Sequence, residues 1–482
     1  MDPLAFEHHL TSPQGHGHRP PNAHTVTTGG GACCDEVTFS VAVDAGRVAD
    51  AGFTARGCGA TTAAASAAVT LIRNAPIVDA ARIGPAQIAD ELGGLSPAKR
   101  HAADVAAEAL ARALGAAVRA DAQITPNPQA TLVAMSGGVD SAVAAHVTAG
   151  LGPALAVTLE LWADHENDAE RSCCSASAVA QARGLAHSMG LPHFTIDLRD
   201  EFRAGVVEPF IAGYASGETP NPCVGCNGHV RLDAMIALAD RLGCATLATG
   251  HYARTAEDGD ERGPLLRAAA DPAKDQTYML AALDPASLAR LRFPLGDLHK
   301  AEVRHLAAEA GLPVAAKADS QDLCFLAGTS RQRFLARHGQ IHDQPGQIAA
   351  SDGTALGRHD GQHRFTVGQR RGIGIHADEP LYVLDKQPDT ATVVVGTKDE
   401  LRTDNVAIRA ARLHRDGARV DRVKLRYHAR PLRANVVGEH VEGRHRSLAL
   451  HLDDPADGPA PGQLACLMDG DLVVGWGTIT RP

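Results

Sequence analysis

Residues 131–147, TLVAMSGGVDSAVAAHV, carry the strongest signal for the fold of this chain. The apolar run 132–135 predicts a buried strand, and the alanine-rich stretch from about residue 142 predicts a helix. Between them, Gly137 and Gly138 let backbone N–H groups approach a ligand closely, and the start of the helix adds partial positive charge. We therefore expect a phosphate-binding loop rather than a plain glycine turn. No Gly-Lys-Ser/Thr sequence follows, so the loop is not a Walker A motif.

Apolar strands and helices alternate after this loop. Strands are expected at residues 154–162, 193–198 and 245–250, with a helix at 176–189. This alternation predicts an α/β domain built on a doubly wound parallel sheet, which binds ligands at the carboxyl ends of its strands. The SGGVDS loop and the segment 249–252 both lie at such ends.

Length, charge and cysteine content limit the classes of function. A chain of 482 residues should hold about three domains. No apolar run approaches the roughly 20 residues of a membrane span, and the N-terminus lacks the apolar core of a signal peptide, so we expect a cytoplasmic protein without a membrane partner. With a net charge of −10, RNA binding would need local patches such as Arg370 and Arg371. Ten cysteines favour redox, sulfur or metal chemistry over structural disulfides.

Composition and periodicity divide the chain into six segments. We expect a disordered arm at 1–25, a small α+β domain at 26–118, a proline-containing linker at 119–130, the parallel-sheet domain at 131–335, a compact central domain at 336–403 and a β-barrel at 404–482. The histidines of the arm are expected to form a solvated tail rather than a metal site. Small barrels commonly present nucleic-acid or partner surfaces, although a plain structural appendage is the alternative.

Cysteines occupy two exposed positions in the predicted α+β domain. Cys33 and Cys34 precede a predicted strand, and Cys58 precedes a predicted helix. A thiol at a helix start has a lowered pKa and more thiolate, the form that binds iron or carries sulfur. The segment resembles the NifU-like iron–sulfur cluster assembly scaffolds in its ACxD step, its GCG turn and its Lys-Arg-His sequence at 99–101. The resemblance implies a metal site that includes Cys33, Asp35 and Cys58.

Two positions depart from the scaffold pattern. The family usually has a third cysteine where this chain has Ala102, and a glycine where it has Cys34. The domain is therefore expected to hold a cluster differently, to pass sulfur only, or to serve as a docking module.

Further cysteines fall in two segments of the parallel-sheet domain. TPNPCVGCN at 219–227 is expected to be a rigid, non-helical loop, and DSQDLCFL at 319–326 contains the lone Cys324. A closed zinc site would need a second Cys-x-x-Cys or two histidines. Thiols that act as nucleophiles near a nucleotide, or three ligands of an open cluster, fit better. Cys173 and Cys174 either relay sulfur or form an unremarkable pair, and Cys244 and Cys466 are expected to be buried.

Taken together, residues 131–482 resemble the bacterial tRNA-specific 2-thiouridylases of the N-type ATP pyrophosphatase superfamily. The motifs that carry the resemblance are MSGGVDS, TPNPxxxCN, ATGHY, KDQTY, QDLCF and TVGQRRGIGI, in the order of the family. The resemblance implies that ATP binds at Ala134, Met135, Ser136, Gly137, Gly138, Val139, Asp140 and Ser141, with Leu159 and Gly250 near the adenosine.

The resemblance also implies roles in catalysis and in tRNA binding. Cys226 matches the nucleophile of the family, and Cys324 matches the cysteine that carries a persulfide. Asn221, Pro222 and Cys223 occupy the positions that meet the target base. Contacts with tRNA are implied for His251, Lys274, Asp275, Gln276, Arg426, Tyr427 and Gln463.

The implied chemistry is adenylation followed by sulfur transfer. ATP activates oxygen 2 of the wobble uridine, which is flipped out of its stack, and Mg²⁺ with Asp140 neutralises phosphate charge. The persulfide sulfur of Cys324, or hydrosulfide released from it by Cys226, then attacks carbon 2. A Cys226–Cys324 disulfide remains and must be reduced. A cysteine desulfurase or a sulfur relay protein is the expected partner besides tRNA.

A cluster is the alternative use of the same thiols. Many family members carry aspartate at the position of Cys223, so Cys223, Cys226 and Cys324 could hold three corners of a [4Fe–4S] cluster; the alternative is that Cys223 is an ordinary loop residue. Two rival functions stay open at this point. One is a different ligase of the pyrophosphatase superfamily, and the other is an iron–sulfur carrier whose nucleotide domain gates cluster release.

Overall fold

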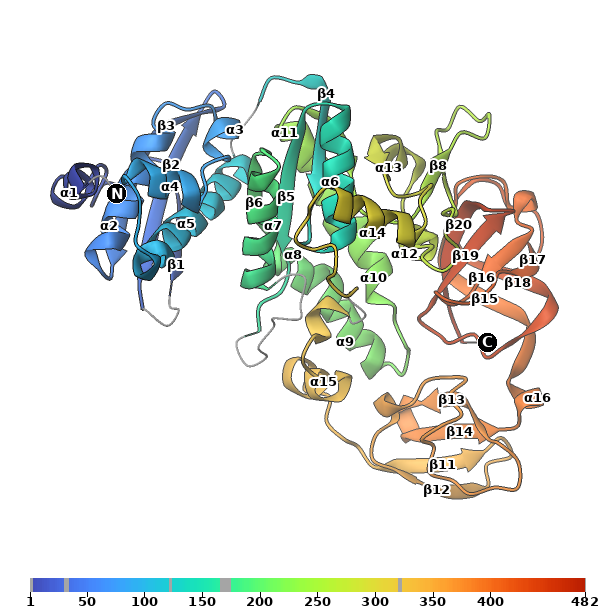
Figure 1. Cartoon of the computed structure of the whole chain (residues 1–482). Helices are drawn as coiled ribbons and strands as arrows, with labels where there is room; N and C mark the ends of the chain where they lie inside the picture. Colours follow the sequence, from blue (N-terminus) through green and yellow to red (C-terminus); the bar gives the residue numbers. More distant parts are fainter. Residues whose placement is uncertain (1–2, 30–33, 121–123, 165–174, 320–322, 482) are drawn as a thin grey trace.

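The computed structural model describes residues 3–29, 34–120, 124–164, 175–319 and 323–481 (Figure 1). An N-terminal α+β domain lies at one end, a parallel-sheet domain lies in the middle, and two β-rich domains lie at the other end (Figure 1). Over the described part of the chain, no helix combines the length and the apolar character that crossing a membrane requires.

The N-terminal domain packs helices on an antiparallel sheet. The sheet has the order β1-β2-β3, and the two-residue turn at Ala45 and Gly46 has positive φ at both positions, as tight hairpins between twisted strands require. Small alanine side chains let α2 approach the sheet closely, and Phe39 and Phe53 are fully buried beneath it. The elements are β1 (His24–Gly29), β2 (Glu36–Asp44), β3 (Arg47–Arg56), α2 (Gly59–Ile72), α4 (Pro85–Glu91) and α5 (Arg100–Ala120).

The first residues of the chain are ordered, so the expected disordered arm at 1–25 is wrong for the described residues. Helix α1 (Pro3–Thr11) packs against α2, and β1 begins at His24. His9 is 4% exposed, and its Nδ1 atom lies 2.8 Å from Ser66 Oγ. The His16 ring also contacts the Phe53 ring at 5.3 Å between centroids. His9 is therefore a packing residue of the N-terminal domain, and His16 is exposed but lies against the same domain, so neither belongs to a disordered tail.

The middle domain is a five-stranded parallel sheet with helices on both faces, which confirms the predicted α/β class. Leu132 and Val133 point into different apolar clusters on opposite faces, so β4 is buried on both sides. Helices α6, α7 and α14 cover one face, and α11 covers the other. The strand order is β10-β7-β4-β5-β6, from β4 (Asn127–Ala134), β5 (Ala154–Glu160), β6 (His193–Asp197), β7 (Cys244–Ala248) and β10 (Leu291–Arg292). The helices are α6 (Val139–Leu151), α7 (Ala176–Ser188), α11 (Leu232–Arg241) and α14 (Lys300–Glu309).

The last two domains are β-rich. The central domain has a four-stranded sheet of order β12-β11-β14-β13, and the C-terminal strands close into a six-stranded barrel through pairing of β15 with β20, as predicted. The central strands are β11 (Gly346–Ala350), β12 (Ala355–His359), β13 (Tyr382–Gln387) and β14 (Thr392–Gly396). The barrel strands are β15 (Arg402–Leu413), β16 (Arg422–Lys424), β17 (Leu432–Val436), β18 (Gly443–Asp457), β19 (Leu464–Asp469) and β20 (Leu472–Ile479).

The N-terminal domain docks on an edge of the parallel sheet. Strand β6 is the outermost strand, and α5 packs along it so closely that a Cβ atom at Gly115 would overlap the carbonyl oxygen of Thr195. Ion pairs reinforce the contact, because Arg183 of α7 binds Glu108 of α5 and Arg112 of α5 binds Glu160 of β5. The two domains therefore share a packed interface.

Candidate active site

The predicted phosphate-binding loop lies between the end of β4 and the start of α6, where the sequence placed it. Gly137 has a φ of +71°, which favours glycine, and the Cβ atom of another residue would come within 3.0 Å of Ala178 O. Ser141 Oγ accepts hydrogen bonds from Ser136 N at 3.1 Å and Ser136 Oγ at 3.2 Å, and it donates to Gly138 O. Ser141 thus holds the loop in a fixed curve ahead of the helix start, whose N–H groups favour an anion.

Gly250 lies against the same helix start. A Cβ atom at this position would stand 2.8 Å from Ser141 N, so only glycine fits there. Leu159 lies on the neighbouring strand β5 and is 8% exposed, with its side chain in the apolar cluster on the far face from α6. The structure therefore brings Gly250 to the loop, whereas Leu159 belongs to the core beside it.

A chain of alternating charges runs from the loop toward the second cysteine segment. Lys300 Nζ lies 2.7 Å from Asp140 Oδ1 and 2.9 Å from Asp319 Oδ1, and Lys274 Nζ lies 2.7 Å from Asp319 Oδ2. Tyr252 also donates its hydroxyl to Asp140 at 2.8 Å. Burial acts to raise the pKa of Asp319, but the hydrogen bonds and charges of the two lysines overcome it and lower the pKa to about 2.

Two lysines beside the loop were not predicted from the sequence. Lys300 is 12% exposed in its side chain, and Lys317 donates to Gly137 O at 2.9 Å and to Gln181 Oε1 at 2.7 Å. Both stand next to glycine and aspartate residues of the SGGVDS motif. Ammonium groups at such positions can neutralise phosphate charge. The sequence alone does not indicate that these lysines belong to the site, because more than a hundred residues separate them from the loop.

The first cysteine segment is helical, which corrects the expected non-helical loop. Asn221 accepts a hydrogen bond from Cys223 N at 3.1 Å and caps α10 (Pro222–Gly225), and Pro222 occupies the first helical position. Proline is compatible with a helix start because no intrahelical hydrogen bond is needed from its nitrogen. A π-helical turn then begins at Cys226, which is 6% exposed.

The second cysteine segment, which contains Cys324, packs on two phenylalanine rings. Cys324 begins a short 3-10 helix, and the Phe325 ring lies 5.2 Å from Phe210 and 5.0 Å from Phe334. Cys226 is buried in the large apolar core that runs through the molecule, and Cys324 packs against that core half-buried. No disulfide joins cysteines within the described residues, so the expected Cys226–Cys324 bond is not a feature of this state. Cys244 and Cys466 are buried, as predicted, whereas Cys173 and Cys174 lie outside the described residues.

The predicted tRNA-contacting residues of the KDQTY and ATGHY motifs make bonds within the protein. Asp275 Oδ2 lies 3.1 Å from Lys424 Nζ of the barrel, and Gln276 accepts from Tyr252 N at 2.9 Å. His251 Nδ1 lies 2.9 Å from Thr249 Oγ1. Together with Lys274, these side chains connect the sheet domain with the barrel and with the charged chain at Asp319.

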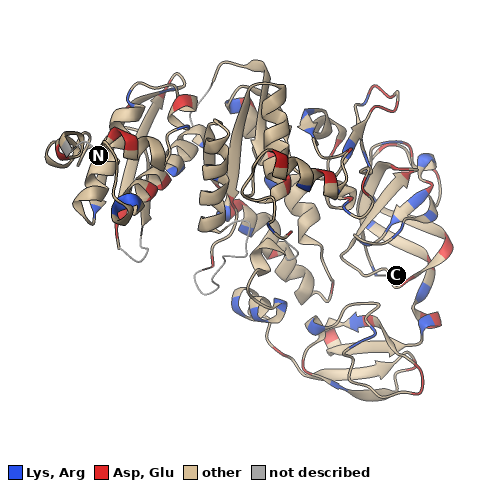
Figure 2. Ribbon diagram, viewed as in Figure 1, with Lys and Arg blue, Asp and Glu red and all other residues tan. Residues whose placement is uncertain are grey.

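The predicted contacts on the barrel are engaged as well. Arg426 donates to Gly458 O at 2.7 Å, and the Tyr427 ring lies 6.3 Å from the Tyr278 ring. Gln463 donates to Thr219 O at 2.5 Å. Lys and Arg residues of the barrel are interspersed with Asp and Glu, whereas helix α15 (Arg331–Gly339) is mainly basic (Figure 2).

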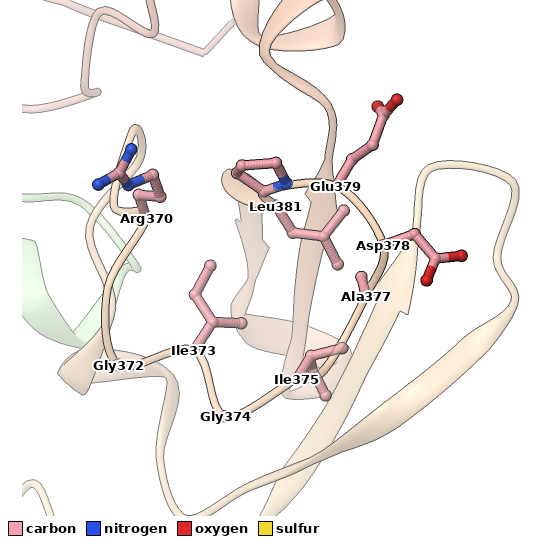
Figure 3. Close-up of a pocket in the computed structure, with 10 residues that line it drawn as sticks. Arg370, Gly372, Ile373, Gly374, Ile375, Ala377, Asp378, Glu379 and Leu381 are labelled. Carbon is pink, nitrogen blue, oxygen red and sulfur yellow. The ribbon is translucent and has the colours of Figure 1, made fainter.

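The loop of the TVGQRRGIGI motif borders a cavity in the central domain. The cavity has a volume of about 360 Å³. Arg370 lies on one side of it, Asp378 and Glu379 lie on the other, and Ile373 and Leu381 lie between them (Figure 3). The cavity is formed by one loop of the central domain and includes no residue of the cysteine segments.

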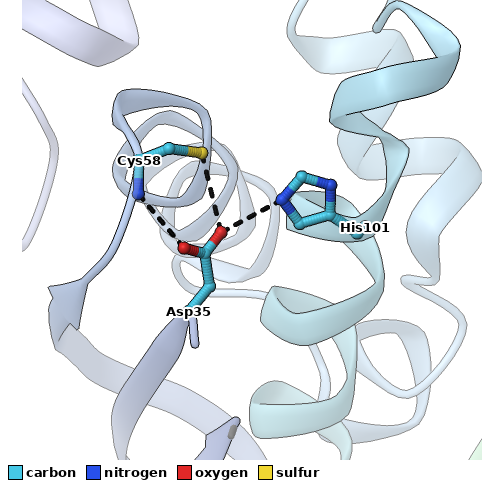
Figure 4. Close-up of side chains that lie close together, drawn as sticks. All are labelled: Asp35, Cys58 and His101. Carbon is cyan, nitrogen blue, oxygen red and sulfur yellow. Dashed lines mark hydrogen bonds and ion pairs between the residues drawn. The ribbon is translucent and has the colours of Figure 1, made fainter. Parts of the chain in front are cut away.

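A separate group of metal-ligand side chains lies in the N-terminal domain. Atoms of Asp35, Cys58 and His101 that can bind a metal all lie within 4.8 Å of one another (Figure 4). His101 Nε2 lies 3.1 Å from Asp35 Oδ2, and Cys58 Sγ lies 3.6 Å from the same oxygen. His101 was part of the scaffold-like pattern but was not predicted as a ligand. Cys33, the third predicted ligand, lies outside the described residues, and Ala102 is fully buried.

The residues around this group hold Asp35 in place and activate Cys58. Gly57 has a φ of +143°, and a Cβ atom there would overlap the Asp35 carboxylate. Thr61 donates to Asp35 Oδ2 at 2.6 Å and lies 3.5 Å from Cys58 Sγ. Burial acts to raise the pKa of the Cys58 thiol, but hydrogen bonds from Thr61 and from the start of α2 outweigh it and lower the pKa. A thiolate, a carboxylate and an imidazole are the donor types that zinc accepts.

The chain was compared with models of known protein families. Four family models match: the NifU-like N terminal domain at 5–120, the tRNA methyl transferase HUP domain at 129–328, the tRNA methyl transferase PRC-barrel domain at 332–397, and the aminomethyltransferase beta-barrel domain at 398–479.

Full-length relatives match as well. A bifunctional protein NifU/MnmA from Rubrobacter xylanophilus is 40% identical over 98% of this chain and 97% of its own length. The tRNA-specific 2-thiouridylase MnmA of Methylorubrum extorquens is 41% identical over 74% of this chain and 94% of its own length. Among solved structures, the U34-tRNA thiolase NcsA from Methanococcus maripaludis with its [4Fe–4S] cluster matches 47% of this chain and 68% of that chain at 18% identity, with a TM-score of 0.28. Because both halves match along their whole length, the chain belongs to the family of bifunctional NifU/MnmA proteins.

Proposed function

We propose that this chain catalyses the ATP-dependent 2-thiolation of the wobble uridine of tRNA. The observation that carries the proposal is the joining of a glycine-rich loop, Lys300 and the Asp319 segment by one chain of ion pairs. A nucleotide bound at the loop would then lie on the same side of the sheet domain as the segment that carries Cys324. The related MnmA proteins are named as tRNA-specific 2-thiouridylases, which supports tRNA as the substrate.

The first step is the transfer of AMP to oxygen 2 of the uridine. The oxygen attacks the α-phosphate of ATP and pyrophosphate leaves, so the oxygen becomes part of a good leaving group. Lys300 and Lys317 neutralise the phosphate charge that develops in this step. Mg²⁺ would be held by Asp140 together with the ATP phosphates, and it supplies further charge neutralisation.

The second step replaces the activated oxygen with sulfur. A sulfurtransferase partner first loads a persulfide on Cys324. Cys226 then attacks the inner sulfur of that persulfide, which forms a Cys226–Cys324 disulfide and releases hydrosulfide. Hydrosulfide adds to carbon 2 and AMP leaves, and a two-electron reductant restores both thiols. Packing around α8 (Arg199–Phe202) supports this route: the Phe325 ring, next to Cys324, lies 5.9 Å from the Phe202 ring, and α8 also contacts the turn that begins at Cys226.

Delivery of sulfur as sulfide bound to an iron–sulfur cluster is the alternative to the persulfide route. In that case Cys223, Cys226 and Cys324 would hold a [4Fe–4S] cluster, which would supply an iron site for sulfide. The two routes differ in metal content. Protein purified without oxygen and reconstituted with iron and sulfide should thiolate tRNA equally well with and without bound iron if the persulfide route operates, whereas activity that depends on iron bound by these cysteines would establish the cluster.

The N-terminal domain is proposed to hold a metal ion at Asp35, Cys58 and His101 and to supply sulfur in cis. The domain is docked on the sheet domain, so its effective concentration is fixed by the fold rather than by diffusion. Loading with zinc or iron and measuring bound metal in the wild type and in Asp35→Ala tests the ligand set. An unchanged stoichiometry in the variant would exclude it.

The decisive test of the enzyme activity is the product. We expect 2-thiouridine in nuclease digests of tRNA incubated with this chain, ATP, Mg²⁺ and a persulfide source, as measured by mass spectrometry of nucleosides. The absence of thionucleoside, together with transfer of a cluster to an acceptor protein without ATP, would instead favour the iron–sulfur carrier function.

A further inference from the structure

The segment 216–220 leads directly into the first cysteine segment and is held by two other domains. It connects α9 (Glu208–Ala215) with Asn221, the cap of α10. We call it the clamped segment. Its hydrogen bonds run mainly to the barrel and to the central domain, which lie far downstream in the sequence.

The barrel binds the clamped segment through backbone and side chains. Arg409 of β15 makes two parallel hydrogen bonds to Glu218, at 2.6 Å and 2.9 Å. Gln463 donates to Thr219 O, and Thr219 N donates to Pro461 O at 2.8 Å. The bidentate arginine–carboxylate geometry fixes direction as well as distance.

The central domain and the chain end hold the other side of the segment. Lys386 is 1% exposed and donates to Phe365 O at 3.1 Å and to Glu218 O at 3.4 Å. Arg481 donates to Ser216 O at 3.1 Å. A buried ammonium group is costly unless carbonyl oxygens satisfy it, so Lys386 would resist any shift of Glu218.

A movement of the clamped segment would also move the cysteines, because the backbone between them is stiff. Pro220 and Pro222 fix the φ angles on either side of Asn221. A Cβ atom at Gly213 would stand 2.8 Å from Pro220, so α9 also packs tightly on the segment. Four residues after Pro222 the chain reaches Cys226. A displacement of Glu218 would therefore move α10, which carries Cys223 and leads directly into Cys226.

We propose that Glu218, Arg409 and Gln463 are positioning residues for the thiol of Cys226, and that the barrel and central domain act on catalysis by holding the clamped segment. The inference rests on the proposed role of Cys226 in sulfur transfer. It assigns to Gln463 a function in the protein itself, in place of the expected contact with tRNA. Binding of tRNA to the barrel would reach the cysteine through the same hydrogen bonds.

The proposal is tested with Glu218→Gln, Arg409→Gln and the double variant, with Arg402→Gln as the matched control. Arg402 lies on the same strand and pairs with Asp457, away from the clamped segment. We expect single-turnover thiolation to fall about ten- to a hundredfold in each single variant, because a shift of about 1 Å in a reacting group has this effect. The double variant should thiolate tRNA as fast as the single variants, since each single substitution already removes the same Glu218–Arg409 interaction. ATP–pyrophosphate exchange, the KM for ATP and the dissociation constant for tRNA should not change.

A readout that does not depend on turnover separates this proposal from the proposed function. The rate of Cys226 alkylation by iodoacetamide, followed by peptide mass spectrometry, should rise severalfold in Glu218→Gln and Arg409→Gln and stay constant in Arg402→Gln. The charge-swapped variant Glu218→Arg with Arg409→Glu should restore both the alkylation rate and thiolation. Unchanged alkylation and thiolation in the single variants would overturn the positioning role. Full thiolation by Cys226→Ser would overturn the proposed function while the alkylation of the other variants is still informative.

Discussion

Lys300 Nζ bridges Asp140 and Asp319, at 2.7 Å and 2.9 Å, and so joins the phosphate-binding loop to the segment that precedes Cys324. The two aspartates are separated by almost 180 residues, yet one ammonium group holds both. Asp140, expected to act through Mg²⁺, therefore also has a direct cationic partner. When ATP binds, its phosphates would enter a site where this lysine already stands.

Replacement of Lys300 by methionine should slow adenylation. The variant keeps the length of the side chain but leaves two carboxylates facing each other and the phosphates, which raises the electrostatic energy of the bound nucleotide. We expect ATP–pyrophosphate exchange in the presence of tRNA to fall at least about tenfold. Lys398→Met, which removes an exposed ion pair with Asp457, serves as the control and should exchange normally. Normal exchange in both variants would exclude Lys300 from this step.

Cys226→Ser and Cys324→Ser should separate adenylation from sulfur transfer. A serine hydroxyl cannot carry a persulfide or form the disulfide, so nucleoside mass spectrometry should detect no 2-thiouridine for either variant. Pyrophosphate exchange should continue, because the nucleotide loop is intact. Cys466→Ala is the control: burial raises the pKa of the Cys466 thiol to about 12, which keeps it protonated and unreactive. Thiolation that survives either serine variant would contradict the sulfur route.

Thr61→Val should raise the pKa of Cys58. Burial opposes the thiolate, and the Thr61 hydroxyl is the first of the hydrogen bonds that outweigh it. In the wild type, the midpoint of Cys58 alkylation against pH should lie below the ordinary value for a thiol, and in the variant it should move upward. Thr70→Val changes the same helix at a residue bonded only to the backbone of Ser66 and should leave the midpoint unchanged. Equal midpoints in all three proteins would show that Thr61 does not activate the thiol.

Lys386 makes stability depend on pH in the alkaline range. Burial lowers the pKa of Lys386 from 10.5 to about 8. Between these values the unfolded chain binds a proton that the folded chain has lost, so the free energy of unfolding rises with pH across this window. In Lys386→Met this rise should be absent. The gain in the free energy of unfolding over the wild type should be largest below pH 8. Urea unfolding at pH 7.5 and 10.5 measures the difference, and a parallel pH response of the two proteins would argue against it.

The architecture could be predicted largely because its signals are local. The apolar run before SGGVDS and the alanine-rich stretch behind it form β4 and α6, and the expected strands at 154–162 and 193–198 correspond to β5 and β6. Periodicity and glycine placement operate over a few residues, so a single sequence contains them. The segment 219–227 differs from its expected non-helical form because its prolines disfavour a helix in general, whereas Pro222 stands at the first helical position, where proline is accepted.

The electrostatic part of the site could not be predicted. Lys300, Lys317 and Thr61 are ordinary residues in sequence, and they become informative only where the fold brings them to Asp140, Gly137 and Asp35. The N-terminal arm shows the same limit, because His9 is ordered by Ser66, which lies 57 residues away. Such contacts depend on tertiary packing and leave no periodic trace in the chain.

The docking of α5 along β6 also has a consequence for any shortened form of this protein. Strand β6 is the last strand of its sheet, and α5 covers the margin where Thr195 presents its carbonyl group. Removal of the first 123 residues would uncover that margin and leave peptide groups ready to accept a strand from another molecule. We therefore expect a form without the N-terminal domain to self-associate more readily than the full chain.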